Sequence, residues 1–311
     1  MPADTESFGE GLWYVIKKAV ANIRPELAEA ARTCAALLSV VLLTSVVKGF
    51  QDAPKQVIDL ISTIAVAALL VKPSNALIRL GIETVKEVTQ YGKLLLPVMT
   101  AAMAAQGGVT ASAALYTGSA FMNALLASAV SDVIVPVLCI YLAVSIANNA
   151  IADELLKNLK VFVKWMMTWG MKIILYVFTG YMGITGVVSG TADAAALKAT
   201  KLTISGVVPV VGGILSDASE AILVGAGVMR SAAGIYGLFA VLAVCIGPFL
   251  KIGVQYLMLK ITAAACGVFG AKDTVGMIRD FSVAMGFLLA MTGTACLLLM
   301  ISTVCFMKEV G

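Results

Sequence analysis

Two carboxylates, Asp217 and Glu220, stand in one of the most apolar parts of the sequence, the stretch GVVPVVGGILSDASEAILVGAG. The same stretch holds Pro209 and the pair Gly212 and Gly213, residues that interrupt a helix. Residues three apart share a helix face, so the two acids point in one direction. Charge at membrane depth is costly unless it is paired or faces water. The pattern predicts either a water-lined constriction or a helix start, where acids favour the positive end of the helix dipole.

A second stretch, LLLPVMTAAMAAQGGVTASAAL, repeats this design with Pro97, Gly107 and Gly108. A weak internal repeat relates 93–150 to 201–255, because two prolines recur at the same spacing in both regions. Short segments interrupted by Gly and Pro in corresponding halves are typical of broken helices in transport proteins. The Lys and Arg residues of the loops allow either re-entrance or full crossing of these segments.

We expect the two stretches to meet near the middle of the membrane and to shape a translocation path or gate. The candidate path residues are Pro97, Gly107, Gly108, Pro209, Gly212, Gly213, Asp217 and Glu220.

Other residues have a structural and a functional interpretation. A stripe of small residues at intervals of three and four predicts close helix packing or, alternatively, a flexible gate; its members are Gly180, Gly183, Gly186 and Gly190. Asp132 lies between two apolar runs and predicts a turn between two spans, with an ion site as the alternative.

The elements that position these residues are membrane helices. The chain has 311 residues, of which 60% are hydrophobic and 13% charged, whereas a soluble domain is about one quarter charged. The sequence predicts an all-α, polytopic integral membrane protein with about seven transmembrane helices and one or two short re-entrant or broken helices. The apolar runs are 33–47, 60–71, 94–131, 133–152, 173–192, 231–250 and 281–307.

The predicted domain organisation is simple. Residues 1–32 are predicted to form an amphipathic interfacial region, with an ordinary juxtamembrane linker as the alternative. Residues 33–307 form the polytopic domain and 308–311 a C-terminal tail. The first residues show no cleavable signal peptide, so either none is needed or one has been removed upstream. Residues 75–93 carry charges on one face and apolar residues on the other, which predicts a helix on the membrane surface or against a partner.

Composition excludes several function classes. The 22 Lys and Arg residues are scattered, so nucleic-acid binding is not expected. Histidine is absent, and no phosphate-binding or metalloprotease motif occurs, so we expect no enzymatic activity, no cofactor and no metal. The six cysteines lie in apolar segments without C-x-x-C spacing, which argues against a disulfide framework or a zinc site.

Residues 186–252 resemble the central block of the stage III sporulation protein AE family, and the similarity extends over roughly 30–305. The positions that match the family pattern are Asp193, Lys201, Pro209, Gly212, Asp217, Gly234, Pro248 and Lys251. The sequence departs from the pattern at two places. Gly213 stands where the family commonly has a basic residue, and Arg230-Ser231 stands where it often has Lys-Asn. Family members often begin with a signal peptide, and the first residues here show no such pattern, so the resemblance leaves the membrane orientation open.

The resemblance implies a membrane protein of endospore-forming bacteria, located in the mother-cell membrane around the engulfed forespore. It implies a permease-like component of a secretion-like channel between the two cells. The expected partners are other stage III sporulation membrane proteins, namely a secretion-type ATPase, a platform-like protein and ring-forming proteins. Membrane lipid is a further expected partner, and a homo-oligomer is an open alternative. Two other functions are also open: an independent secondary transporter of a small solute, and a structural anchor for the ring-forming proteins.

Overall fold

The computed structural model describes residues 13, 14, 17, 21, 23–50, 55–105, 109–151, 153–184, 232–269 and 272–308. Every element longer than a single turn in these residues is a helix, which confirms the all-α prediction. The elements are α2 (Arg24–Lys48), α3 (Lys55–Ala105), α4 (Val109–Ser128), η1 (Ala129–Ile134), α5 (Val135–Ile151), α6 (Glu154–Ile184), α9 (Ala232–Gly267) and α10 (Lys272–Lys308).

The described residues contain six helical segments long and apolar enough to cross a membrane. These segments are 24–48, 57–101, 115–151, 154–178, 237–267 and 274–306. The predicted polytopic membrane protein is therefore confirmed. The apolar run predicted at 173–192 extends beyond the described residues, so the count of about seven spans stays a prediction.

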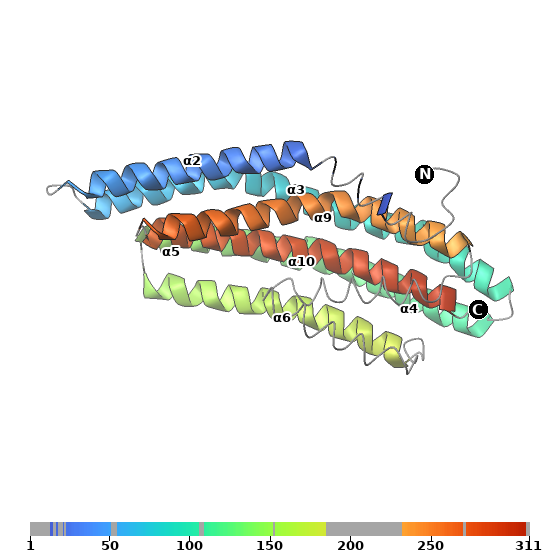
Figure 1. Cartoon of the computed structure of the whole chain (residues 1–311). Coiled ribbons are helices and arrows are strands. Elements are labelled where there is room, and N and C mark those ends of the chain that lie inside the picture. Colours follow the sequence, from blue (N-terminus) through green and yellow to red (C-terminus); the bar gives the residue numbers. More distant parts are fainter. Residues whose placement is uncertain are drawn as a thin grey trace, which may run out of the picture.

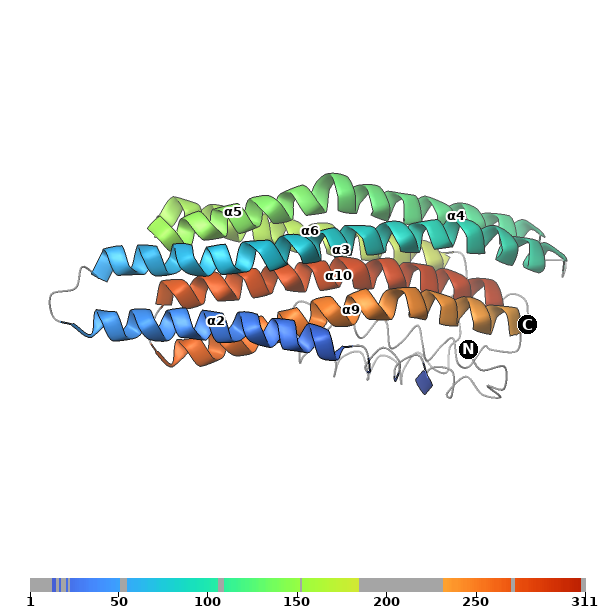
Figure 2. The same cartoon turned by 90° about the horizontal axis from the view of Figure 1, so that it is seen from above.

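The helices lie nearly side by side in one elongated bundle (Figures 1 and 2). α4, η1 and α5 follow one another as a single rod that packs against α3. α10 occupies the centre of the bundle: 94% of its most apolar window is buried, against 22% to 33% for the other five segments. It packs mainly on α9 and α3 and also contacts α4, α5 and α6.

Two glycines of α3 allow this helix to approach α10 closely. A Cβ atom added at Gly81 would lie 3.0 Å from Met291 Cε and 3.4 Å from Leu288 Cδ2. A Cβ added at Gly92 would lie 3.1 Å from Leu299 Cδ1. Small residues at a helix interface permit the close backbone contact on which membrane helix packing depends.

Residues 75–93 do not form a separate surface helix; they are the middle of α3, a helix of 51 residues. Their apolar face packs within the same chain, because Ile78, Val85 and Val88 are buried in the core cluster that includes α10. Their charged face is exposed, and it carries Arg79, Glu83, Lys86, Glu87 and Lys93. Periodicity identified the two faces correctly, but it does not identify the surface against which the apolar face packs.

The turn predicted at Asp132 is wrong. Asp132 is exposed within η1, a π-helical turn that joins α4 to α5 without a break. The Val135 amide donates to the Val130 carbonyl, five residues back. Pro136 follows directly and lacks the N–H that would bond the Asp132 carbonyl. A single π turn lets the rod continue past this proline.

The expectation against a disulfide is also wrong at one pair of cysteines. Cys245 of α9 and Cys296 of α10 form a disulfide, with 6.1 Å between their Cα atoms. They are 51 residues apart in the sequence and meet because α9 and α10 pack along their length. Local cysteine spacing carries no information about such a contact between helices.

Replacement of Gly81 by leucine should destabilise the bundle, because the new side chain collides with Met291 and Leu288. Overpacking of this kind costs about 1–3 kcal/mol. The matched control is Gly170→Leu on α6, where an added Cβ meets nothing within 4 Å among the described residues. Melting temperatures of the purified variants in detergent measure the effect. Equal melting temperatures for the two variants would contradict the close α3–α10 contact.

Candidate functional site

Most of the candidate path residues lie outside the described part of the chain. These are Gly107, Gly108, Pro209, Gly212, Gly213, Asp217 and Glu220. The described one, Pro97, is exposed on α3, and the helix continues past it to Ala105. Proline is tolerated in membrane helices, where neighbouring groups can satisfy the freed carbonyl. The meeting of the two Pro/Gly-Gly segments stays a prediction.

The glycine stripe is described only at its start. Gly180 and Gly183 belong to the last turns of α6, whereas Gly186 and Gly190 lie outside the described residues. A Cβ added at Gly180 meets nothing within 4 Å in the described ranges. Neither close helix packing nor a gate is therefore tested at this stripe.

A polar cluster that the sequence analysis missed lies between α5, α6 and α10. Its centre is Asp280 of α10, which is 8% exposed. Lys160 Nζ of α6 lies 2.9 Å from Asp280 Oδ2 and forms an ion pair with it. The Asn149 amide donates to the same oxygen at 2.8 Å, and the Tyr141 hydroxyl donates to Oδ1 at 3.3 Å. We call these four residues the polar cluster.

Helix geometry explains why these side chains converge. Tyr141 and Asn149 of α5 are eight residues apart, which places them on one helix face about two turns apart. The Asn149 amide also donates to the Ser145 carbonyl at 2.7 Å, which fixes its orientation. On α10, Gly276 stands one turn before Asp280, and a side chain there would overlap Asn149 Oδ1. The glycine therefore makes room for the amide that reaches Asp280.

The charges of the polar cluster compensate each other. Lys160 and Asp280 have side chains that are mostly withdrawn from solvent, and each satisfies the other. Loss of one partner of a buried pair leaves an uncompensated charge, at a cost of roughly 3–5 kcal/mol. No group of three His, Cys, Asp or Glu side chains in the described ranges could hold a metal. The cluster can thus couple three helices through one charge pair.

Two further ion pairs also connect different helices. Lys251 Nζ of α9 lies 2.8 Å from Glu26 Oε1 of α2. Lys48 of α2 forms an ion pair with Asp59 of α3. Lys251 is the lysine that matches the family pattern, and the structure gives it a partner that sequence comparison did not indicate.

The sequence pattern does not indicate the polar cluster. Asp280 borders the apolar run that begins at 281, where an acid is ordinary at a membrane surface. Lys160 stands between Lys157 and Lys164, both of which are exposed. Spacing on α6 alone does not distinguish the lysine that faces the bundle. The contact joins residues 120 apart in the chain.

Replacement of Asp280 by asparagine should destabilise the protein, because the Lys160 ammonium then lacks its counter-charge. We expect a loss of roughly 3–5 kcal/mol. The additional change Lys160→Met should recover part of this loss, with a coupling of about 1 kcal/mol or more. Lys157→Met is the matched control, because Lys157 is exposed and pairs within its own helix with Glu154. Thermal unfolding in detergent measures these three variants and the single variant Lys160→Met; strictly additive effects of the two cluster substitutions would argue against the pair.

Comparisons with known proteins agree with the family resemblance of the residue patterns. The family model described as stage III sporulation protein AE matches residues 6–309. The chain is 18% identical over 220 residues to the protein named "Stage III sporulation protein AE" of Bacillus subtilis (strain 168). This alignment covers 71% of the chain and 55% of the relative, so the chain spans about half the length of the curated relative it matches. No solved structure matches. Since the family model covers nearly the whole sequence, the chain belongs to the stage III sporulation protein AE family.

Proposed function

We propose that this chain is the permease-like membrane component of a secretion-like channel between mother cell and forespore. Family membership supports a role in sporulation, and the six apolar helical segments support a place in a membrane. The proposal places the protein in the mother-cell membrane around the engulfed forespore. Its partners are a secretion-type ATPase, a platform-like protein and ring-forming proteins of stage III sporulation. The chain has no catalytic activity of its own, so the ATPase or a gradient supplies the energy.

The observation that carries the proposal is the buried charge pair on the central helix. α10 is enclosed by its neighbours, and Asp280 reaches Lys160 across an interface between helices. Ionisable residues within membrane segments are rare and mark ion or substrate pathways by default. In the proposed function the pair holds α10 and α6 in one register beside the path.

α10 also constrains where a path could run. It fills the centre of the described bundle, so cargo would not pass along that axis without displacing it. In the proposed function the path lies on a face that this chain contributes to a larger assembly. Pro97 agrees with that arrangement, because it is exposed on α3 rather than turned toward α10.

The second candidate is a structural anchor for the ring-forming proteins. The close packing of α10 favours it, because a filled centre gives rigidity and needs no opening. The two candidates differ in whether the remaining candidate path residues touch water. They therefore predict different solvent accessibility for Asp217 and Glu220.

Cysteines introduced as Gly213→Cys and Asp217→Cys should react with a membrane-impermeant thiol reagent if these positions line a wet path. The background would lack the six native cysteines, after its level in the membrane has been checked. Leu288→Cys is the control, since Leu288 is fully buried on α10 and should stay unmodified. Modification of detergent-extracted complexes from sporulating cells is measured by mass shift. Complete protection of both positions in the assembled complex would count against a wet path.

The double variant Asp217→Asn with Glu220→Gln separates channel from anchor. If the acids line a path, spore yield should fall at least tenfold while the complex still assembles, because only the charge in the path has changed. An anchor whose acids merely begin a helix should keep both assembly and spore yield. Assembly is measured by gentle detergent extraction from sporulating cells and identification of co-purifying stage III proteins. Purification of the wild-type chain without any of these proteins would reject complex membership itself.

A further inference from the structure

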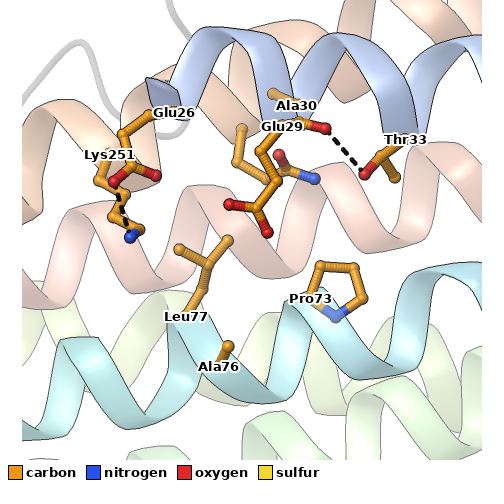
Figure 3. A pocket seen from close by; sticks show the side chains of 9 residues that line it. Glu26, Glu29, Ala30, Thr33, Pro73, Ala76, Leu77 and Lys251 are labelled. Carbon is orange, nitrogen blue, oxygen red and sulfur yellow. Dashed lines mark hydrogen bonds and ion pairs between the residues drawn. The ribbon is translucent and has the colours of Figure 1, made fainter. Parts of the chain in front are cut away.

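A cavity of about 80 Å³ lies between α2, α3 and α9 (Figure 3). Its wall combines carboxylates, one ammonium, one amide and small or apolar side chains. The lining residues are Glu26, Glu29, Ala30, Thr33, Pro73, Ala76, Leu77, Lys251 and Gln255. It is separate from the polar cluster, which lies between α5, α6 and α10. We call it the α2–α3–α9 cavity.

The charges of the cavity leave one carboxylate without a partner. Lys251 Nζ lies 2.8 Å from Glu26 Oε1, so these two groups neutralise each other. Glu29, which is exposed, follows Glu26 by three residues, and its carboxylate lies toward α3 between Leu77 and Pro73 (Figure 3). No ion pair of the Glu29 carboxylate occurs among the described residues. Two carboxylates and one ammonium give the cavity a net charge of one negative unit.

A second observation, independent of the acids, points to a ligand. Gln255 of α9 lines the cavity and is only 8% exposed, yet its amide has no hydrogen-bond partner in the described ranges. Among the described residues, no hydrogen bond reaches the Gln255 carbonyl oxygen, Glu26 Oε2 or the Glu29 carboxylate, so the cavity holds several unused acceptors.

The residue types select among ligand classes. An anion is disfavoured, because Glu26 already neutralises Lys251 and Glu29 repels negative charge. A divalent metal ion is also disfavoured. Ca²⁺ needs six or more oxygen ligands, and the Lys251 ammonium beside Glu26 repels any divalent cation. A quaternary ammonium group prefers an aromatic cage, and none of the nine lining residues is aromatic. A primary ammonium has one positive charge and three N–H donors.

We propose that the α2–α3–α9 cavity binds a primary ammonium group. The Glu29 carboxylate supplies the counter-charge, and the Gln255 carbonyl oxygen and Glu26 Oε2 accept the remaining N–H donors. Glu26 and Lys251 position one another, so that Glu26 Oε2 stays available.

The position of the cavity favours a lipid headgroup as the source of the ammonium. The exposed surface of α3 changes at this level from apolar residues at Leu69 and Val71 to the charged residues Lys72 and Arg79. Such a change is typical of the boundary between hydrocarbon and headgroups. Phosphatidylethanolamine presents a primary ammonium at that depth. A free amine offers the same chemistry from solution.

The experiment compares lipids that differ only in the methylation of the amine. The full-length chain is placed in nanodiscs of phosphatidylcholine alone, or mixed with phosphatidylethanolamine or its N,N-dimethyl form. We expect phosphatidylethanolamine to raise the melting temperature most, the dimethyl form less and phosphatidylcholine not at all. In detergent, ethanolamine should raise the melting temperature if the source is a free amine. Equal melting temperatures in the three lipids, with no effect of ethanolamine, would overturn the proposal.

Single substitutions test whether the change in melting temperature arises from binding in the cavity. Glu29→Gln removes the unpaired charge and should weaken ammonium binding at least tenfold, measured by titration of the melting temperature. Gln255→Leu should weaken it as well, since the amide oxygen is lost. Glu83→Gln is the matched control, because Glu83 is exposed as Glu29 is but does not line the cavity. A wild-type response in Glu29→Gln, with the variant's own melting temperature unchanged, would contradict the assignment.

Discussion

The packing of α3 and α9 against α10 is the interaction on which the rest of the bundle depends. Lipid is as apolar as a leucine side chain, so helices in a membrane associate through close van der Waals contact rather than through the hydrophobic effect. Gly81 and Gly92 bring α3 near α10, and the Cys245–Cys296 disulfide joins α9 to it. With α10 held on these sides, the rod of α4, η1 and α5 and the helix α6 complete its enclosure.

Ion pairs fix the register between helices, which close packing alone does not specify. Apolar contacts between long helices change little when one helix slides by a turn, whereas a charge pair is satisfied in one register only. The pairs Lys160–Asp280, Lys251–Glu26 and Lys48–Asp59 each join two different helices. Each therefore fixes a position along the bundle axis. The polar cluster and the α2–α3–α9 cavity both include such a pair, so register and candidate function depend on the same residues.

The sequence predicted the class of the fold well because apolar runs and helical periodicity are local properties. The predicted runs 33–47 and 281–307 fall within α2 and α10, and the buried face of residues 75–93 was separated correctly from the charged face. The predicted runs 94–131 and 133–152 instead divide a helical segment that continues from 115 to 151. The prediction was also wrong at Asp132 and at Cys245–Cys296, where the outcome depends on a π turn before Pro136 and on a contact between helices. The polar cluster was missed for the same reason, since Asp280 and Lys160 pair across 120 residues. Of the candidate path, the structure describes Pro97 alone.

The length of α3 bears on the choice between a lone carrier and a component of an assembly. A helix of 51 residues extends roughly 75 Å, more than twice the thickness of about 30 Å of a hydrocarbon core. The exposed charges from Lys72 to Lys93 occupy roughly 33 Å in the middle of it. That segment cannot face lipid tails, because its outward charges have no partners there. It must face water or another protein, and a carrier enclosed by the bilayer offers no reason for so long a charged surface. In the proposed function, contact with other subunits supplies one.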